Sequence, residues 1–234
     1  MLNIRPFSSL GGANHGWLNA KHHFSFANYY DPHRMGWGAL RVWNDDEIAP
    51  KTGFPPHSHS NMEIITYVRE GAITHKDNLG NQGRTEAGDV QVMSAGDGVQ
   101  HSEYNLEDTP TKIFQIWIMP DEDKLGGAPA WGSKPFPKTE RLDQWIVVAS
   151  GRGDTDGLLI RANAKVVVAN ISPGHTLRYT LDDQRVGYLV AAQGHLKVNG
   201  REVLSRDGVA FDEDVVVENT GSTPLEVIVV DVQR

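Results

Sequence analysis

Two short histidine-containing motifs are the residues in this chain best suited to chemistry. The first is His57-Ser58-His59, and the second is His101-Ser102-Glu103. Because side chains alternate between the two faces of a β-strand, residues i and i+2 point the same way. If the motifs lie on facing strands of a small barrel, His57, His59, His101 and Glu103 bring three imidazoles and one carboxylate together. Such a set suits a divalent transition metal with at least one open position.

A second carboxylate leaves the choice of acidic ligand open. Glu63 lies four residues after His59, so the same alternation allows it to face the same interior. It could be a fifth ligand, a substitute for Glu103, or a partner that holds an imidazole in one tautomer. The alternation cannot decide, because Ser60 and Asn61 are able to bend the strand. His75, on the next expected strand, is the other histidine expected nearest to this pocket, either as a partner of a ligand or as a plain cross-strand contact.

The composition limits the kinds of partner. The chain has 234 residues, a formal net charge of −8 and no cysteine. An acidic protein is a poor ligand for nucleic acid or for an anionic membrane, both of which need a basic face. No apolar run reaches the roughly 18 residues of a membrane span, and the N-terminal residues lack the apolar core of a signal peptide. We therefore expect a cytoplasmic protein whose metal is held by histidine, carboxylate and water.

The elements that must position these motifs are predicted to be short strands. Helical periodicity is scarce, and 24 Gly and 12 Pro residues separate many short apolar runs, which is typical of an all-β sandwich or barrel. The expected strands of the first half are 38–43, 62–68, 72–76, 89–93, 100–104 and 112–119. Those of the second half are 144–149, 158–161, 166–171, 187–191, 195–198, 209–211, 215–218 and 225–232. Residues 120–139, rich in Pro, Gly and acidic residues, indicate a linker.

The two halves are similar enough to be a diverged repeat. Segments 67–71, 87–92 and 107–113 resemble segments 189–194, 206–211 and 221–227. We therefore expect an N-terminal barrel over residues 1–120, a linker over 121–143 and a C-terminal barrel over 144–234. The metal motifs occur only in the first. Where the second should carry His-x-His it reads Leu177 to Asp182, so this barrel is expected to be degenerate and metal-free.

At these motifs the chain resembles the cupins, and more narrowly the pirin family. The cupin pattern is a His-x-His followed by Glu, and later Gly, His and Asn. Here it reads His57, His59 and Glu63, then Gly98, His101 and Asn105. The shorter lead-in of the first motif and the extra residues before the second histidine are similar to pirins. Segments 24–32, 62–67 and 93–103 are similar too, so the resemblance spans nearly the whole chain.

The resemblance implies a bicupin of two tandem jelly-roll barrels with one metal, usually iron, in the N-terminal barrel. Carried over by position, the ligands are His57, His59, His101 and Glu103, which leaves Glu63 beside the site rather than in it. Some bacterial pirins, and the human one, are associated with quercetin 2,3-dioxygenase activity. The human relative is also described as a nuclear co-regulator of transcription.

The resemblance implies an oxygen-dependent enzyme that cleaves flavonols such as quercetin and releases carbon monoxide. One or two open metal positions would take the substrate or dioxygen. Glu103 could serve as ligand and as acceptor of the proton of the 3-hydroxyl, by resemblance to flavonol dioxygenases. The alternatives are a metal-binding regulatory protein that modulates a protein partner without turnover, and a cupin acting on another enolisable substrate. Fe(2+) is the expected metal, and Zn, Ni, Mn, Co and Cu also suit the donors.

Overall fold

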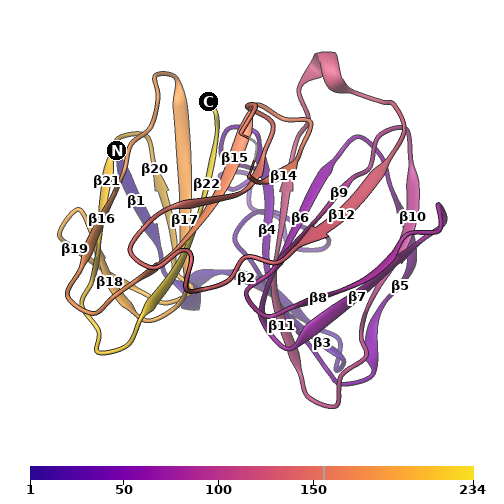
Figure 1. Ribbon diagram of the computed structural model, residues 1–234, viewed down its shortest axis with the longest axis horizontal. Helices are drawn as coiled ribbons and strands as arrows, with labels where there is room; N and C mark the ends of the chain where they lie inside the picture. Colours follow the sequence, from indigo (N-terminus) through magenta and orange to yellow (C-terminus); the bar gives the residue numbers. More distant parts are fainter. Residues whose placement is uncertain (155) are drawn as a thin grey trace.

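The predicted all-β bicupin fold is confirmed. The computed structural model describes residues 1–154 and 156–234, which form two barrels lying side by side (Figure 1). The strands of the first half are β1 (Leu2–Arg5), β2 (Gly11–Asn14), β3 (Leu18–His22), β4 (Leu40–Ile48), β5 (Thr52–His59), β6 (Glu63–Glu70), β7 (Ala72–Asp77), β8 (Gln82–Glu86), β9 (Val90–Ser94), β10 (Val99–Asn105), β11 (Thr111–Ile118) and β12 (Ala130–Lys134). Those of the second half are β13 (Ile146–Ser150), β14 (Leu158–Leu159), β15 (Ala164–Ile171), β16 (Thr176–Tyr179), β17 (Arg185–Gln193), β18 (His195–Val198), β19 (Arg201–Leu204), β20 (Gly208–Phe211), β21 (Val215–Asn219) and β22 (Leu225–Gln233). Two short 3₁₀ turns complete the list, η1 (Phe7–Ser9) and η2 (Glu122–Lys124).

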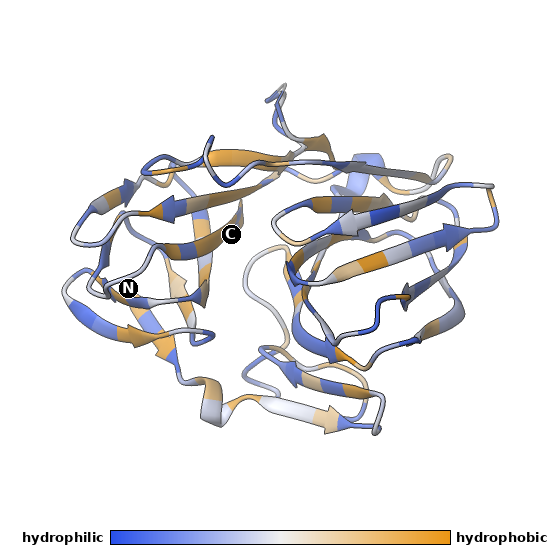
Figure 2. Ribbon diagram, turned by 60° about the horizontal axis from the view of Figure 1, so that its bottom comes forward, coloured by the Kyte–Doolittle hydropathy of each residue, from blue (hydrophilic) through white to orange (hydrophobic). Residues whose placement is uncertain are grey.

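Each barrel is built from one large and one small sheet. In the first barrel the seven-stranded sheet has the order β12-β9-β6-β11-β4-β3-β2, and it faces the four-stranded sheet β5-β10-β7-β8. In the second barrel the corresponding orders are β1-β20-β17-β22-β15-β13-β14 and β16-β21-β18-β19. Hydrophobic and hydrophilic residues alternate along many of these strands, as expected for sheets with two different faces (Figure 2).

Two strands cross the predicted division of the chain. Strand β1, at the N-terminus, pairs with β20 and so belongs to the sheet of the second barrel (Figure 1). Strand β12, inside the expected linker 121–143, pairs with β9 and extends the large sheet of the first barrel. Leu2 and Ile4 pack against the core of the second barrel, which explains why β1 leaves the half that it begins. The domain boundaries at residues 120 and 143 therefore stay a prediction. The strand pairing crosses them, because β1 joins the second barrel and β12 joins the first.

The two barrels share an apolar interface between their large sheets. One buried cluster combines side chains of β4, β6 and β11 with side chains of β15, β17 and β22, among them Trp43, Ile65, Phe114, Val166, Tyr188 and Ile228. The other faces of the same sheets point into the barrels, because successive side chains alternate. The interiors are therefore separate from the interface, and a residue's parity on its strand decides which of the two it enters.

Arg141, from the segment between the barrels, ties the interface together. Its side chain is completely buried. It donates hydrogen bonds to Gly88 O (3.1 Å) and Tyr67 Oη (2.9 Å) in the first barrel and to Asn170 Oδ1 (2.6 Å) in the second. A buried guanidinium is tolerated when its N–H groups are paired in this way. Among the described residues, no helix is both long and apolar enough to span a membrane.

Candidate metal centre

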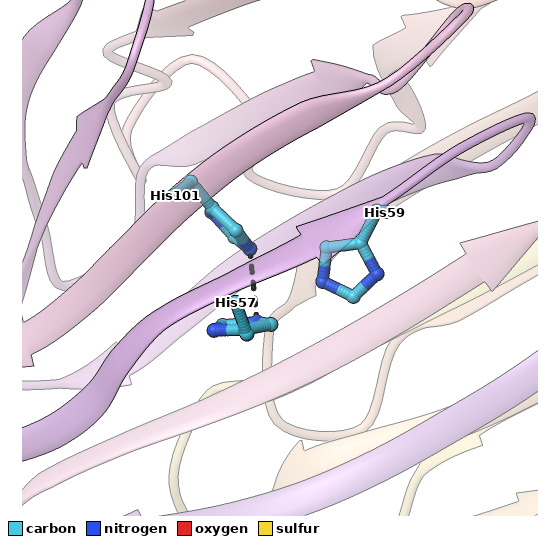
Figure 3. A group of neighbouring side chains, drawn as sticks. All are labelled: His57, His59 and His101. Carbon is cyan, nitrogen blue, oxygen red and sulfur yellow. Dashed lines mark hydrogen bonds between the residues drawn. The ribbon is translucent and has the colours of Figure 1, made fainter.

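The two histidine motifs meet on neighbouring strands of the small sheet. Strand β5 pairs antiparallel with β10 so that His57 lies opposite His101 and Val99 lies opposite His59. The register shifts between His101 and Glu103, because β5 carries an extra residue at Pro55 and Pro56. Proline cannot donate to a ladder, and it is accepted here because β5 is an edge strand with a bulge. The pairing of β5 with β10 brings the three histidines of the motifs together (Figure 3).

The hydrogen bond made by His57 fixes its tautomer. Its Nδ1 lies 2.7 Å from the carbonyl oxygen of Pro55. A carbonyl oxygen only accepts, so Nδ1 carries the proton and the neutral ring keeps its lone pair on Nε2. A histidine that binds a metal through one nitrogen usually donates the other N–H to such a partner.

The tautomer of His101 is also fixed, in this case by two successive hydrogen bonds that lead through His75 to Asp77. Asp77 Oδ2 lies 3.0 Å from His75 Nε2, and His75 Nδ1 lies 3.3 Å from His101 Nδ1. The carboxylate accepts, so His75 is protonated on Nε2 and its Nδ1 is the acceptor for His101 Nδ1–H. The lone pair of His101 is therefore on Nε2.

The two free lone pairs converge on one point. His57 Nε2 and His101 Nε2 lie 3.1 Å apart, as the dashed line in Figure 3 shows. Two unprotonated nitrogens repel each other at this distance unless a cation lies between them. Metal–nitrogen bonds of about 2.1 Å at angles of roughly 90–110° place the two nitrogens roughly 3.0–3.4 Å apart. The pair therefore fits a shared metal ion.

His59 completes a group of three imidazoles. Its ring centroid lies 4.8 Å from that of His57 and 5.0 Å from that of His101. Ligand nitrogens of the three residues all lie within 4.8 Å of one another. Burial, together with the neighbouring His57, lowers the pKa of His59 to about 4. Burial and the surrounding histidines lower that of His101 to about 3. Both rings are thus neutral at neutral pH, the state that binds metals.

Glu103 lies next to this group inside the barrel. Its carboxylate forms a second group of possible ligands with His75 and His101. It accepts hydrogen bonds from Gln91 Nε2 (2.7 Å) and Gln115 Nε2 (2.8 Å), and a longer one from Thr66 Oγ1 (3.4 Å). Burial raises the pKa of Glu103 to about 7, although all three hydrogen bonds oppose the shift. His101 therefore joins the three-histidine group to the carboxylate.

Glu63 faces away from this interior. It shares its parity on β6 with Ile65 and Tyr67, which enter the interface between the barrels. Its carboxylate accepts a 2.6 Å hydrogen bond from Ser94 Oγ. Asn61 has a φ of 47° in the turn between β5 and β6, so the alternation counted from His59 does not continue to Glu63. Of the alternatives that alternation left open, those that need Glu63 to face the same interior as His59 are therefore excluded.

Several residues of the site lie outside the sequence motifs. The sequence motifs do not contain Gln91, Thr66 or Gln115, although each is a polar residue at an inward position of an otherwise apolar strand. That pattern is a usable signal, because an unpaired polar group in a core is costly. The expectation that His75 lies near the pocket is confirmed, and its Nδ1 lies 3.3 Å from His101 Nδ1.

Comparison with known proteins identifies the family of this chain. The model of the Pirin family matches residues 3–118, and that of the quercetinase C-terminal cupin domain matches residues 147–232. A pirin-like protein of Caulobacter vibrioides is 60% identical over 232 residues, 99% of each chain. The chain belongs to the pirin family.

Two further comparisons bear on the chemistry. A quercetin 2,3-dioxygenase of Escherichia coli is 35% identical over 232 residues, which cover 99% of this chain and 98% of that protein. The crystal structure of the bacterial pirin YhhW from Escherichia coli in complex with nickel(II) superposes with a TM-score of 0.91 at 34% identity, covering 100% of this chain and 99% of that one. A solved pirin of the same fold thus binds a divalent transition metal.

Proposed function

We propose that this pirin holds one divalent metal through His57, His59, His101 and Glu103 and cleaves flavonols with dioxygen, as a quercetin 2,3-dioxygenase does. The observation that carries the proposal is the convergence of two Nε2 lone pairs, 3.1 Å apart, from rings whose tautomers are fixed independently. The names of the relatives supply the substrate class. The expected metal is Fe(2+), and nickel is the ion named with a relative.

A bound metal would supply Lewis-acid binding of the substrate oxygen and of dioxygen in its open positions. The chain itself supplies an acceptor for the proton of the flavonol 3-hydroxyl. Glu103 suits this role because it is a buried carboxylate beside His101, oriented by Gln91 and Gln115. Gln91 and Thr66 both donate to Oε1, whereas Oε2 accepts from Gln115 alone and keeps room for one more hydrogen bond.

Aromatic side chains next to His59 suit a flat substrate. Trp117 packs against His59 edge-to-face with ring centroids 5.0 Å apart, and Phe26 packs against Trp117 at 5.4 Å. Both aromatic residues are partly exposed, so they are accessible to a ligand. A planar flavonol contacting these rings would bury apolar surface while its 3-hydroxyl reaches the histidines.

The test is the stoichiometry of the reaction, measured as the amounts of flavonol and dioxygen consumed and of carbon monoxide released. Ring cleavage consumes one dioxygen per flavonol and releases one carbon monoxide together with a depside. Metal-loaded protein should consume quercetin only in air and should yield carbon monoxide in equal amount. Glu103→Gln should slow turnover at equal metal content, and Glu63→Gln, a matched change outside the barrel interior, should not. Quercetin loss without carbon monoxide, or equal turnover by metal-stripped protein, would overturn the dioxygenase proposal. Binding of metal with no turnover would favour the regulatory alternative.

A further inference from the structure

His75 uses both of its ring nitrogens without belonging to the metal motifs. It is completely buried on β7, opposite Glu103 in the register with β10. Its Nε2 donates to Asp77 Oδ2 at 3.0 Å, and its Nδ1 lies 3.3 Å from His101 Nδ1. A buried imidazole bonded on both sides cannot rotate or change tautomer without losing a hydrogen bond. The ring is therefore a fixed acceptor aimed at His101.

Asp77 determines which atoms donate and which accept in the series of hydrogen bonds from Asp77 through His75 to His101. Its Oδ1 accepts the backbone N–H groups of Leu79 and Asn81, both at 3.0 Å. Its Oδ2 accepts the Asn81 side-chain amide at 2.9 Å as well as His75 Nε2–H. A carboxylate held by four donors is an anchored acceptor. The proton of His75 consequently stays on Nε2, and the position left for a hydrogen bond from His101 is Nδ1.

Strand β12, which lies in the segment expected to be a linker, packs against the face of the His75 ring. Trp131, on β12, stacks on His75 with centroids 4.8 Å apart and an interplanar angle of 9°. The approach depends on Gly83, which lies opposite His75 on β8, because a Cβ there would come within 2.2 Å of the indole. Strand β12 thus closes the barrel beside His75.

We propose that His75 is a positioning residue of the metal centre, which keeps the proton of His101 on Nδ1 and its Nε2 lone pair directed at His57, with Trp131 holding the ring in place. The inference rests on the proposed metal site and does not depend on the flavonol as substrate. Partners of this kind typically change metal affinity 10–100-fold when removed.

Two variants separate the hydrogen bond from the packing. His75→Phe keeps a flat ring against Trp131 but removes both nitrogens. His75→Asn keeps an acceptor near the position of Nδ1 and loses most of the ring. His195→Asn removes an exposed histidine of the second barrel and serves as the control. Folding of each variant is checked by its amide NMR spectrum.

The experiment combines two measurements on the full chain. The affinity for Zn²⁺ is measured by competition with a chelator, and the tautomer of His101 is read from ¹⁵N shifts of the histidine side chains without metal. We expect His75→Phe to weaken Zn²⁺ binding about 10–100-fold and to leave His101 as a mixture of tautomers. His75→Asn should recover part of both, and His195→Asn should change neither.

An unchanged Zn²⁺ affinity and an unchanged His101 tautomer in His75→Phe would overturn the inference. A larger loss of Zn²⁺ affinity in His75→Asn than in His75→Phe would also do so, because it would show that His75 acts through the packing of its ring on Trp131. Failure of the metal site itself is distinguishable: the unsubstituted protein would then bind no Zn²⁺, while the ¹⁵N shifts would still report whether His75 fixes the tautomer of His101.

Discussion

The two barrels share a scaffold and fill their interiors with opposite chemistry. One asparagine marks the same point in each. Asn105 Nδ2, at the end of β10, donates to Ile48 O (3.0 Å) and Thr109 O (2.9 Å). Asn219 Nδ2, at the end of β21, donates to Ile171 O (2.7 Å) and Thr223 O (2.8 Å). The two asparagines therefore make β10 and β21 equivalent, position by position.

At the positions that precede these asparagines, the second barrel has aliphatic residues where the first barrel has the proposed metal ligands. Val217 stands in the place of Glu103, and Val215 stands in the place of His101. Tyr179 lies opposite Val215, as His57 lies opposite His101. The second barrel therefore has the strands of the site without its ligands.

The same replacement extends to the residues that hold Glu103. In the first barrel Thr66 pairs with Gln91 and Gln115 across the large sheet. In the second barrel Leu189 pairs with Val209 and Val229 in the same arrangement. The site is thus a set of mutually bonded polar residues that is present or absent as a whole, because a half-satisfied buried network is worse than an apolar core.

The largest effect should come from placing one member of the set alone in the second barrel. Val217→Glu buries a carboxyl group with none of the amide donors that Glu103 has. We expect a loss of at least about 4 kcal/mol of unfolding free energy, or no folding. Urea unfolding measures it. Val216→Glu, on the exposed face of the same strand, is the control and should be within about 0.5 kcal/mol of the unsubstituted protein. Similar stabilities for the two variants would contradict the comparison.

A smaller effect should follow when the first barrel is changed toward the second. Gln115→Val, the residue found at the equivalent position, removes the donor to Glu103 Oε2 and the acceptor of Trp117 Nε1. We expect a loss of about 1–3 kcal/mol in urea unfolding of the metal-free protein. Val229, the equivalent residue of the second barrel, has no polar partner. Val229→Ala should therefore cost a similar amount only through the cavity that it leaves. A neutral Gln115→Val would show that Glu103 does not need its amide partners.

A third effect concerns acid sensitivity outside both interiors. His23 is completely buried at the interface, where its Nδ1 lies 2.9 Å from Tyr188 Oη. Burial, with the nearby Arg5 and Arg206, lowers the pKa of His23 to about 3. Between this value and the unfolded pKa near 6.5 the unfolded chain binds the extra proton, so stability falls as the pH falls.

His23→Gln should remove this part of the pH dependence. From pH 7 to pH 5 the variant should lose about 2 kcal/mol less unfolding free energy than the unsubstituted protein. Exposed His15→Gln is the control and should keep the full dependence. If His23→Gln also keeps it, the acid sensitivity belongs to the histidines of the first barrel, such as His59 and His101.

Local sequence predicted many of the strands and the main histidines, because both depend on alternation within one strand. The short or edge strands β1, β2, β3, β5, β8, β12, β16 and β19 were not predicted. Parity placed His57 with His59, and the β-rich context placed His101 on a strand. That strand, β10, is the hydrogen-bonded neighbour of β5 in the same sheet and does not face it across the barrel as expected. Parity failed at Glu63, because the turn at Asn61 resets the alternation. Strand β5 itself was not predicted, since its Gly53, Pro55 and Pro56 are typical of turns.

Pairing between distant segments could not be predicted from local pattern. The pairing of β1 with β20 joins the two ends of the chain, and β12 lies in a segment whose composition indicates a linker. Both pairings are decided by which sheet edge offers partners and apolar cover, which no short window of sequence contains. The stack of Trp131 on His75 was hidden for the same reason.

The central claim is that the first barrel holds one metal between His57 and His101. The most direct measurement is the metal content and Zn²⁺ affinity of the metal-stripped and reloaded protein beside two variants. The unsubstituted protein should bind one ion, Glu63→Gln should bind one ion with similar affinity, and His57→Ala/His101→Ala should bind none at the same concentration. One ion bound with unchanged affinity by the double variant would contradict the account.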